Sequence, residues 1–387
     1  MKSGVGNKSA LALLRRTVGW ALVLVSGTVW AARFPTPSGL RDPVVFSFCT
    51  VGDSRADAKD PALPAQDRIW LQNTKVLSRL IREMQAQKPN ALFFNGDMIV
   101  GYSTNAHLLN RQYAYWRGMM SALLQTGTYL IPVPGNHEVQ IKLPTDDPEE
   151  DPIKVAQREG EEAWRDNMGD LILDTNLWTS LIGLVPTAWD TNHAPPVGGP
   201  DAIRSDQRQL SFSFDCQTLH FAVINTDPYG NDSHAPVSWL REDLAQAKAR
   251  GCCHFFVFGH KMAFTYRYKT DLKAKGLDAF PQESLAFWRV IQDFDATYFC
   301  GHEHIYHAMQ PQTSVGHGAW QIIVGSGGSP FEAKPGESAD SKDRLYVWAK
   351  IEVHRSGRVR LDAYGFDEHW GPTHLVQSIE LHGPMKD

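Results

Sequence analysis

Cysteine is scarce in this chain of 387 residues, and basic residues do not outnumber acidic ones. There are five cysteines, an odd number, so at least one thiol has no partner within the chain. The 38 lysines and arginines stand against 43 aspartates and glutamates, which gives a formal net charge of -5. A basic face that would bind nucleic acid is therefore not expected. Apolar residues make up 42% of the sequence, enough for a sizeable globular core.

Long apolar runs are also missing, with one exception near the N-terminus. The run "TVGWALVLVSGTVWAA" covers residues 17–32 and follows a flank that contains Arg15 and Arg16. A basic flank, a short apolar core and small residues at its exit are typical of a signal peptide, which we expect at residues 1–31. An uncleaved membrane anchor and a twin-arginine export signal are the alternatives. The sequence predicts a periplasmic or secreted protein that meets a membrane only through this leader.

The five cysteines have different surroundings in the sequence. Cys49 and Cys300 lie within apolar, strand-like runs, which favours buried thiols that act as small hydrophobic side chains. Cys216 is a possible disulfide partner of either Cys252 or Cys253, and spacing alone does not decide between them.

Apolar runs that end in turn residues alternate with segments of helical periodicity. Such runs are typical of strands buried on both faces, and their alternation with helices predicts an α/β domain with parallel strands. The expected strands are 44–53, 91–97, 129–138, 253–260 and 296–302, and the expected helices are 65–89, 106–125 and 281–293. No internal repeat interrupts this order, and we expect one domain over residues 32–387.

Residues 140–210 break the alternation, and we interpret them as an insertion in the domain. The stretch "PTDDPEEDP" is acidic and rich in proline, which favours a solvated loop. Because the insertion follows a candidate site motif directly, part of it is a candidate for shaping a substrate cleft. Residues 209–227 then alternate on either side of a turn and predict a β-hairpin.

Five of the expected strands end in residues with metal-binding side chains. In an open α/β sheet, ligands gather at the carboxyl ends of the strands, so these ends can meet at one pocket. Carboxylate and amide oxygens mixed with imidazoles suit Zn, Mn or Fe at two adjacent positions. The strand-end residues are Asp53, Asp97, Asn136-His137-Glu138, His260 and His302-Glu303-His304.

These strand ends read "GDSR", "NGDM", "PGNHE", "FGHK" and "CGHEH". In that order they resemble the motifs of the calcineurin-like metallophosphoesterases, and the resemblance covers about residues 44–335. The sequence that flanks the motifs is most similar to the purple-acid-phosphatase-like branch. The resemblance implies a four-layer α/β/β/α sandwich of two mixed sheets, with metal ions at one rim. It implies an exported metallophosphoesterase, a hydrolase that cleaves a small-molecule phosphate ester with metal-activated water.

The same resemblance implies a role for each motif residue. Asp53, Asp97 and His304 would hold a first metal ion. Asp97, Asn136, His260 and His302 would hold a second, so that Asp97 bridges the two. His137 would be the general acid that protonates the leaving group, and Glu138 would orient it. The expected cofactors are one or two divalent or trivalent ions per chain, of Fe, Zn or Mn.

Two positions depart from the family pattern. Arg55 stands where the family has a histidine ligand of the first metal, and a guanidinium has no lone pair to give. Its fork is suited to holding a substrate phosphate instead. Val100 stands where purple acid phosphatases have a tyrosine ligand, and the nearest tyrosine, Tyr102, is a guess for that role. The ligands of the second metal are complete, whereas those of the first are not.

Other interpretations of these residues remain open. Asp53 is also suited to capping a turn, Asn136 to forming one, and single histidines in this region are often structural. A phosphodiesterase or nucleotide hydrolase is an alternative enzyme, and a catalytically degenerate metal- or phosphate-binding protein is the alternative outside enzymes. Arg55 favours the degenerate protein, whereas His137 argues against it. The physiological substrate and the oligomeric state stay undetermined by the sequence.

Overall fold

The structure is a computed structural model that describes residues 42–57, 59–61, 63–145, 152–269, 272–313 and 318–384. The predicted signal peptide lies outside the described residues, as does most of the acidic run at 144–152. Within the described ranges, no helix has both the length and the apolar character that a membrane span requires.

The first of two large sheets joins N-terminal parallel strands to a C-terminal antiparallel meander. Strands β1, β2 and β3 pair in parallel, and β12 pairs with β1 in the antiparallel direction. The order is β14-β13-β12-β1-β2-β3. The bounds are β1 (Val44–Val51), β2 (Ala91–Phe94), β3 (Tyr129–Pro132), β12 (Leu345–His354), β13 (Val359–Asp367) and β14 (His374–His382).

The second large sheet has a parallel centre and antiparallel edges. Strands β7, β8, β9 and β11 run parallel to one another, whereas β6 and β10 pair with the two outer ones in the antiparallel direction. The order is β10-β11-β9-β8-β7-β6. The bounds are β6 (Phe212–Cys216), β7 (Leu219–Val223), β8 (His254–Phe258), β9 (Thr297–Cys300), β10 (Tyr306–Met309) and β11 (Gln321–Val324).

Phenylalanine side chains from both sheets form the core between them. Phe48 on β1 makes edge-on contacts with Phe256 and Phe258 on β8, at centroid distances of 5.2 and 5.8 Å. Phe93 on β2 stacks on Phe258 at 3.8 Å. Burying each such ring contributes about 1.5–3 kcal/mol, so this layer fixes the two sheets face to face.

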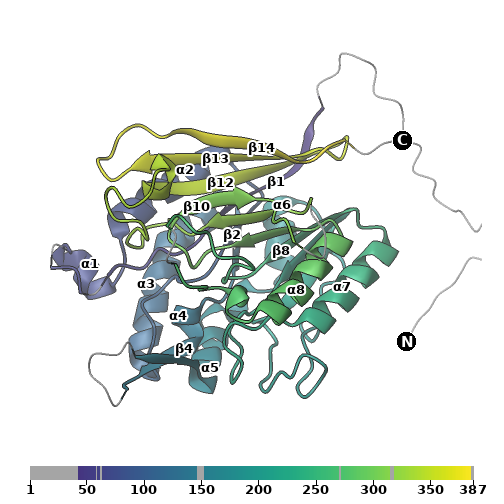
Figure 1. The fold of residues 1–387 in the computed structure, drawn as a ribbon. Helices are drawn as coiled ribbons and strands as arrows, with labels where there is room; N and C mark the ends of the chain where they lie inside the picture. Colours follow the sequence, from purple (N-terminus) through teal and green to yellow (C-terminus); the bar gives the residue numbers. More distant parts are fainter. Residues whose placement is uncertain are drawn as a thin grey trace, which may run out of the picture. The chain divides into compact units, whose positions relative to one another are not determined.

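Helices cover the outer face of each sheet (Figure 1). Helices α2 (Thr74–Gln87) and α3 (Ala106–Gln125) pack on the first sheet, whereas α6 (Thr175–Ile182) contacts both sheets through Trp178, which packs on Phe46 of β1 and Phe214 of β6. Helices α7 (Val237–Arg250) and α8 (Pro281–Asp293) lie side by side and pack their apolar residues against the outer face of the second. The predicted four-layer α/β/β/α sandwich of two mixed sheets is confirmed.

The expected helix at 65–89 is two helices, α1 (Ala65–Trp70) and α2. Leu71 takes a left-handed conformation with φ 57°, which ends α1. The side chain of Asn73 then accepts a hydrogen bond from the backbone N–H of Val76 and caps α2. Continuous apolar spacing concealed this break, because an N-cap inside a periodic run leaves the period intact.

The insertion at 140–210 contains regular structure on both sides of the acidic run for which we expected a loop, and most of that run lies outside the described residues. It contains β4 (Gln140–Leu143), β5 (Ile153–Ala156) and α5 (Arg158–Met168), in addition to α6. Trp164 and Trp178 are fully buried and anchor α5 and α6, so these tryptophans outweigh the polar composition around them. Short 3₁₀ turns occur at Gly169–Leu171, Leu277–Ala279 and Ser341–Arg344.

The hairpin predicted at 209–227 is present as the antiparallel pair β6 and β7. All five cysteines are free, so the possible bridge from Cys216 to Cys252 or Cys253 is not formed. Cys49 and Cys300 are fully buried among apolar side chains, as their surroundings predicted.

Candidate metal centre

The predicted ligand residues meet where the central strands of both sheets end. Asp53 follows β1, Asp97 follows β2, and Asn136 begins the short helix α4 (Asn136–Val139) after β3. His260 follows β8, and the segment after β9 carries His302 and His304. The backbones of Asp53, Asp97 and His302 are left-handed, with φ of 61°, 52° and 70°. Such strain at three non-glycine residues is typical of a functional site.

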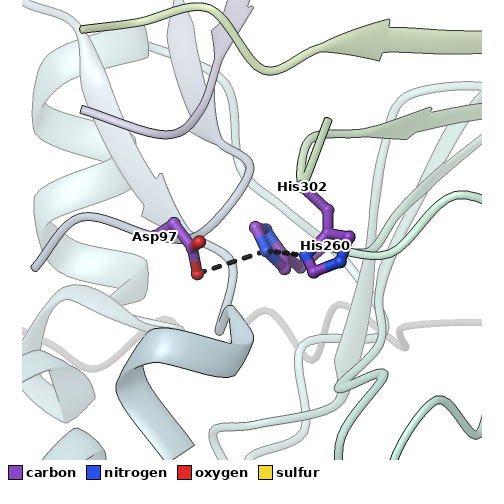
Figure 2. Close-up of side chains that lie close together, drawn as sticks. All are labelled: Asp97, His260 and His302. Carbon is purple, nitrogen blue, oxygen red and sulfur yellow. Dashed lines mark hydrogen bonds and ion pairs between the residues drawn. The ribbon is translucent and has the colours of Figure 1, made fainter. Parts of the chain in front are cut away.

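Four of these side chains point their polar atoms at one spot. Oδ1 of Asn136 lies 3.0 Å from Nε2 of His260 and 2.8 Å from Nδ1 of His302. Oδ1 of Asp97 lies 3.2 Å from the same His260 nitrogen. Figure 2 shows Asp97, His260 and His302 turned toward one another from different elements. These are the residues predicted for the second metal, and we call them with Asn136 the second set.

The hydrogen-bond chemistry of the second set fits a cation. Nδ1 of His260 lies 2.7 Å from the carbonyl of Asn95 and must donate to it, because a carbonyl can only accept. In the neutral ring, Nε2 therefore carries a lone pair that faces the acceptor oxygens of Asn136 and Asp97, whereas in the charged ring Nε2 carries a proton that it donates to them. Acceptors that face each other at about 3 Å need a proton or a metal ion between them.

The residues predicted for the first metal, which we call the first set, are more widely spaced. Nε2 of His304 lies 3.6 Å from Oδ1 of Asp53. The guanidinium of Arg55 lies among them, with Nη2 3.4 Å from Nε2 of His304 and Nε 3.7 Å from Oδ2 of Asp97. Oδ1 of Asp53 is buried and accepts no hydrogen bond from any described residue.

Burial and the charges of neighbouring side chains shift the pKa values of the residues in the centre. Burial raises the pKa of Asp53 well above its usual range. Burial acts on Asp97 in the same direction, but the charges of His137 and His260 hold its pKa well below the usual range. Burial opposes a charge on His260, yet the carboxylates of Asp97 and Asp53 raise its pKa to about 10. A positive charge beside the Asp97 carboxylate, carried by a proton or by a metal ion, is therefore favoured in this centre.

His137 faces the same centre, but its ring is oriented by a different residue from the one we predicted. Its Nε2 lies 3.6 Å from Oδ2 of Asp97. Its Nδ1 lies 2.6 Å from the carbonyl of Val100, which fixes the ring and leaves Nε2 toward the centre. The prediction that Glu138 orients this ring is wrong, because the carboxylate of Glu138 is occupied by backbone groups.

Glu138 instead ties the loop after β2 to the loop after β3. Its two oxygens accept hydrogen bonds from the backbone N–H groups of Asp97, Met98, Ile99 and Gly135, at 2.7–3.2 Å. Burial and the charge of Asp97 raise the pKa of Glu138 to about 7, although these four donors favour its ionised form. Glu138 therefore positions the backbone that carries Asp97.

Tyr102 lies at the centre but beside the second set, away from the first. The side-chain amide of Asn136 donates a hydrogen bond to its hydroxyl, and its ring packs on His137 with centroids 4.0 Å apart. Burial raises the pKa of the Tyr102 hydroxyl. The guess that Tyr102 completes the first set is not supported by these contacts, because the hydroxyl is used to orient Asn136.

The centre opens into a cavity of about 440 Å³. Several of its lining residues come from segments that the motifs do not cover. Gln140 and Lys154 belong to the β4–β5 hairpin, so part of the insertion lines this cavity. Lys261 follows a predicted ligand directly in the sequence, whereas Lys275 and Glu332 carried no sequence signal. Lys275 is paired with Glu332, at 2.6 Å, and Lys261 with Asp227, at 2.6 Å.

Other histidines and aromatic residues that we weighed as cleft residues lie elsewhere. His193 contacts Asp243, and His234 contacts Glu283 and the carbonyl of Asp201. The ring of Tyr266 stacks on His307 at 3.8 Å. Tyr229, Phe264 and Tyr266 do not line this cavity in the described part of the chain.

Comparison with known proteins identifies the class. The model of the calcineurin-like phosphoesterase family matches residues 70–306, and the chain belongs to this family. It is therefore a metallophosphoesterase by class, as the order of the motifs predicted. A comparison with curated proteins found no match.

Two solved structures show the same fold. One is a purple acid phosphatase from yellow lupin (Lupinus luteus) seeds, with 12% identity and a TM-score of 0.50 over 88% of this chain and 54% of the lupin chain. The other is PhoD, with 12% identity and a TM-score of 0.51 over 89% of this chain and 74% of PhoD. The chain thus spans about half the length of the lupin enzyme, and at this identity the likeness is one of fold.

Proposed function

We propose that this protein hydrolyses a small phosphate ester at the metal centre. The observation that carries the proposal is the meeting of Asp97, Asn136, His260 and His302 with acceptor atoms turned toward one point. When bound there, a metal ion would supply positive charge for the phosphate oxygens and a water acidic enough to attack phosphorus. Asp97, Asn136, His260 and His302 would hold that ion, of Fe, Zn or Mn.

His137 is the proposed general acid. Hydrolysis forms a bond from water oxygen to phosphorus, breaks the bond to the leaving oxygen, and needs a proton on that oxygen. Nε2 of His137 faces the cavity, while the Val100 carbonyl holds Nδ1. Burial lowers the pKa of His137, and the negative charge of Asp97 opposes this. A phosphate dianion beside the ring adds to that opposition and favours the protonated ring that can donate.

The cavity supports a small anionic substrate. Four cationic side chains line it, those of Arg55, Lys154, Lys261 and Lys275, together with the His137 and His302 rings. The ring of Tyr102 lies under the ammonium groups of Lys142 and Lys154, at 4.2 and 5.6 Å. Asp97, Asp232 and Glu332 line the cavity as well, and Lys261 and Lys275 are paired with acidic residues. Arg55 and Lys154 are the side chains that we propose attract the phosphate group.

The experiment is turnover of an aryl phosphate by metal-depleted protein before and after metal is returned. We expect no turnover without metal, recovery on adding it, and none at any metal concentration for Asp97→Asn. Metal-independent turnover, or none with metal bound, would refute the proposal. The latter result would favour the binding-only alternative. An aryl phosphodiester of the same leaving group, turned over faster than the monoester, would favour the phosphodiesterase alternative.

We also propose that the protein acts outside the cytoplasm, because residues 1–31 have the composition of a signal peptide. Expression of the full chain should yield a mature product that begins at Ala32 in an exported fraction. N-terminal sequencing of that product tests this, and an uncleaved chain held in the membrane would contradict it.

A further inference from the structure

The guanidinium of Arg55 lies where three side chains of the first set converge. Single oxygens of Asp53 and Asp97 and a ring nitrogen of His304 lie within 4.8 Å of one another, a spacing that suits one metal ion. Arg55 places Nη2 3.4 Å from the His304 nitrogen and Nε 3.7 Å from the Asp97 oxygen. The guanidinium thus stands beside two of the three atoms that a first metal ion would need.

The contact with His304 uses the lone pair on which a metal would depend. Nδ1 of His304 lies 2.6 Å from the carbonyl of Pro330, so it donates there and Nε2 is the acceptor. That acceptor faces an N–H of Arg55, which has only donors. A lone pair that accepts from a guanidinium is not available to a cation.

The charge of Arg55 also disfavours a metal ion in the first set. Asp53 and Asp97 are both buried, and Arg55 brings one positive charge beside them in an interior where charges interact strongly. A divalent ion at the same place would meet that fixed cation at a few ångströms.

Arg55 is also held in place by its own backbone. Residue 55 forms an isolated bridge with Gln72, and its carbonyl accepts a hydrogen bond from the Ser329 hydroxyl at 3.1 Å. The preceding residue, Ser54, donates from its N–H to the carbonyl of Asp97 at 3.1 Å. The side chain is 17% exposed, so it lies mostly within the wall of the cavity.

We propose that Arg55 takes the place of one of the two metal ions, so that this chain binds a single ion, on the second set. The guanidinium would meet the phosphate oxygen that a first ion would otherwise meet, through the N–H groups that line the cavity. This inference rests on the proposed function for its substrate, but its account of the metal content stands without turnover.

Metal stoichiometry tests it directly. Protein loaded with Mn²⁺ and freed of loose ions should carry one equivalent per chain, with the electron paramagnetic resonance signal of an isolated ion. Arg55→His, which restores the family's ligand, should carry two equivalents with a spin-coupled signal. Arg55→Ala separates the loss of positive charge from the gain of a ligand, and we expect it to bind a second ion more weakly than Arg55→His.

Two matched variants locate the single ion. His302→Ala should lose it, whereas His304→Ala should retain it, because only His302 belongs to the second set. Two tightly bound ions in the unaltered chain, or retention by His302→Ala with loss by His304→Ala, would overturn the inference.

The outcomes also separate the two proposals. Two ions with metal-dependent turnover would refute this inference and leave the proposed function standing. One ion without turnover would do the reverse. If Arg55→His fails to fold, as judged by circular dichroism, the count in the unaltered chain and the two histidine variants still decide.

Discussion

The carboxylate of Glu138 accepts a hydrogen bond from the backbone N–H of Asp97, with 2.9 Å between Oε2 and N. Together with its bonds to the next two backbone N–H groups, this contact fixes the left-handed turn that aims the Asp97 side chain at the centre. One acidic residue on α4 thus positions a ligand on a different strand end.

Glu138→Gln should therefore weaken both the fold and metal binding. A glutamine keeps one acceptor oxygen but turns an NH₂ group toward backbone donors, which leaves buried N–H groups unpaired. We expect a loss of about 2–3 kcal/mol in the free energy of unfolding, and at least about tenfold weaker metal binding. Urea unfolding and a metal titration measure these. Glu162→Gln, on the exposed side of α5, is the matched control and should change neither.

His137→Ala should slow turnover by about 10²–10⁴-fold for a substrate with a poor leaving group, such as an alkyl phosphate. The loss should be much smaller for an activated aryl phosphate, whose leaving oxygen needs no proton. The dependence of kcat on leaving-group pKa measures this difference. Equal losses on both substrates would contradict the acid role and leave His137 as a binding residue.

The free energy of unfolding should depend on pH because of His220, a buried histidine outside the metal centre. His220 lies between two carboxylates, with Nδ1 2.7 Å from Asp215 and Nε2 2.8 Å from Asp243. Burial opposes its charge, but these hydrogen bonds raise its pKa above 6.5, its unfolded value. The charged ring therefore stabilises the fold fully below pH 6.5, and this contribution is lost as pH rises through the folded pKa.

His220→Gln should lower the free energy of unfolding by about 1–3 kcal/mol at pH 5.5, because Asp215 and Asp243 each lose a charged hydrogen-bond partner but keep Arg250 and His193, respectively. The difference from the unaltered chain should shrink at pH 8.5. Urea unfolding at both pH values checks the sign. His369→Gln, at an exposed position, is the control. A difference that is equal at both pH values, or that grows as pH rises, would show that His220 is not charged in the fold.

Lys154→Ala should raise KM for an aryl phosphate and leave kcat nearly unchanged. Lys154 lines the cavity from the β4–β5 hairpin and belongs to neither ligand set. Loss of this exposed positive charge should cost about 0.5–1 kcal/mol of substrate binding, or roughly a 2–5-fold rise in KM, and more at low salt. Steady-state kinetics at two salt concentrations measure this, with Lys88→Ala, an exposed lysine, as control. A fall in kcat with KM unchanged would mean that Lys154 acts in the chemical step.

Sequence reasoning placed the ligands because each follows an apolar run that ends at the same edge of a sheet. Asp53, Asp97 and His260 could be found in this way, since strand direction fixes where their side chains meet. The sequence does not say which partner a side chain chooses among several within reach. Glu138 bonds to four backbone groups, and Val100 holds the His137 ring, because the loops after β2 and β3 happen to lie against each other.

The cavity wall was less predictable than the centre. Lys275 and Glu332 come from segments without a motif and meet only through the fold, 57 positions apart in the sequence. Lys154 lies next to an acidic, proline-rich run, and that composition concealed the β4–β5 hairpin to which it belongs. Arg55 was visible as a departure from the family pattern, but only its distances to His304 and Asp97 show what it contacts.

Anomalous diffraction from a crystal grown with Mn²⁺ or Zn²⁺ in excess, recorded at the absorption edge of that metal, is the most direct test of the metal centre. We predict one strong peak within bonding distance of Asp97, Asn136, His260 and His302. Between His304 and Asp97, the electron density should fit the guanidinium of Arg55, and no anomalous peak should lie there. A map with no peak among those four side chains would contradict the account at its centre.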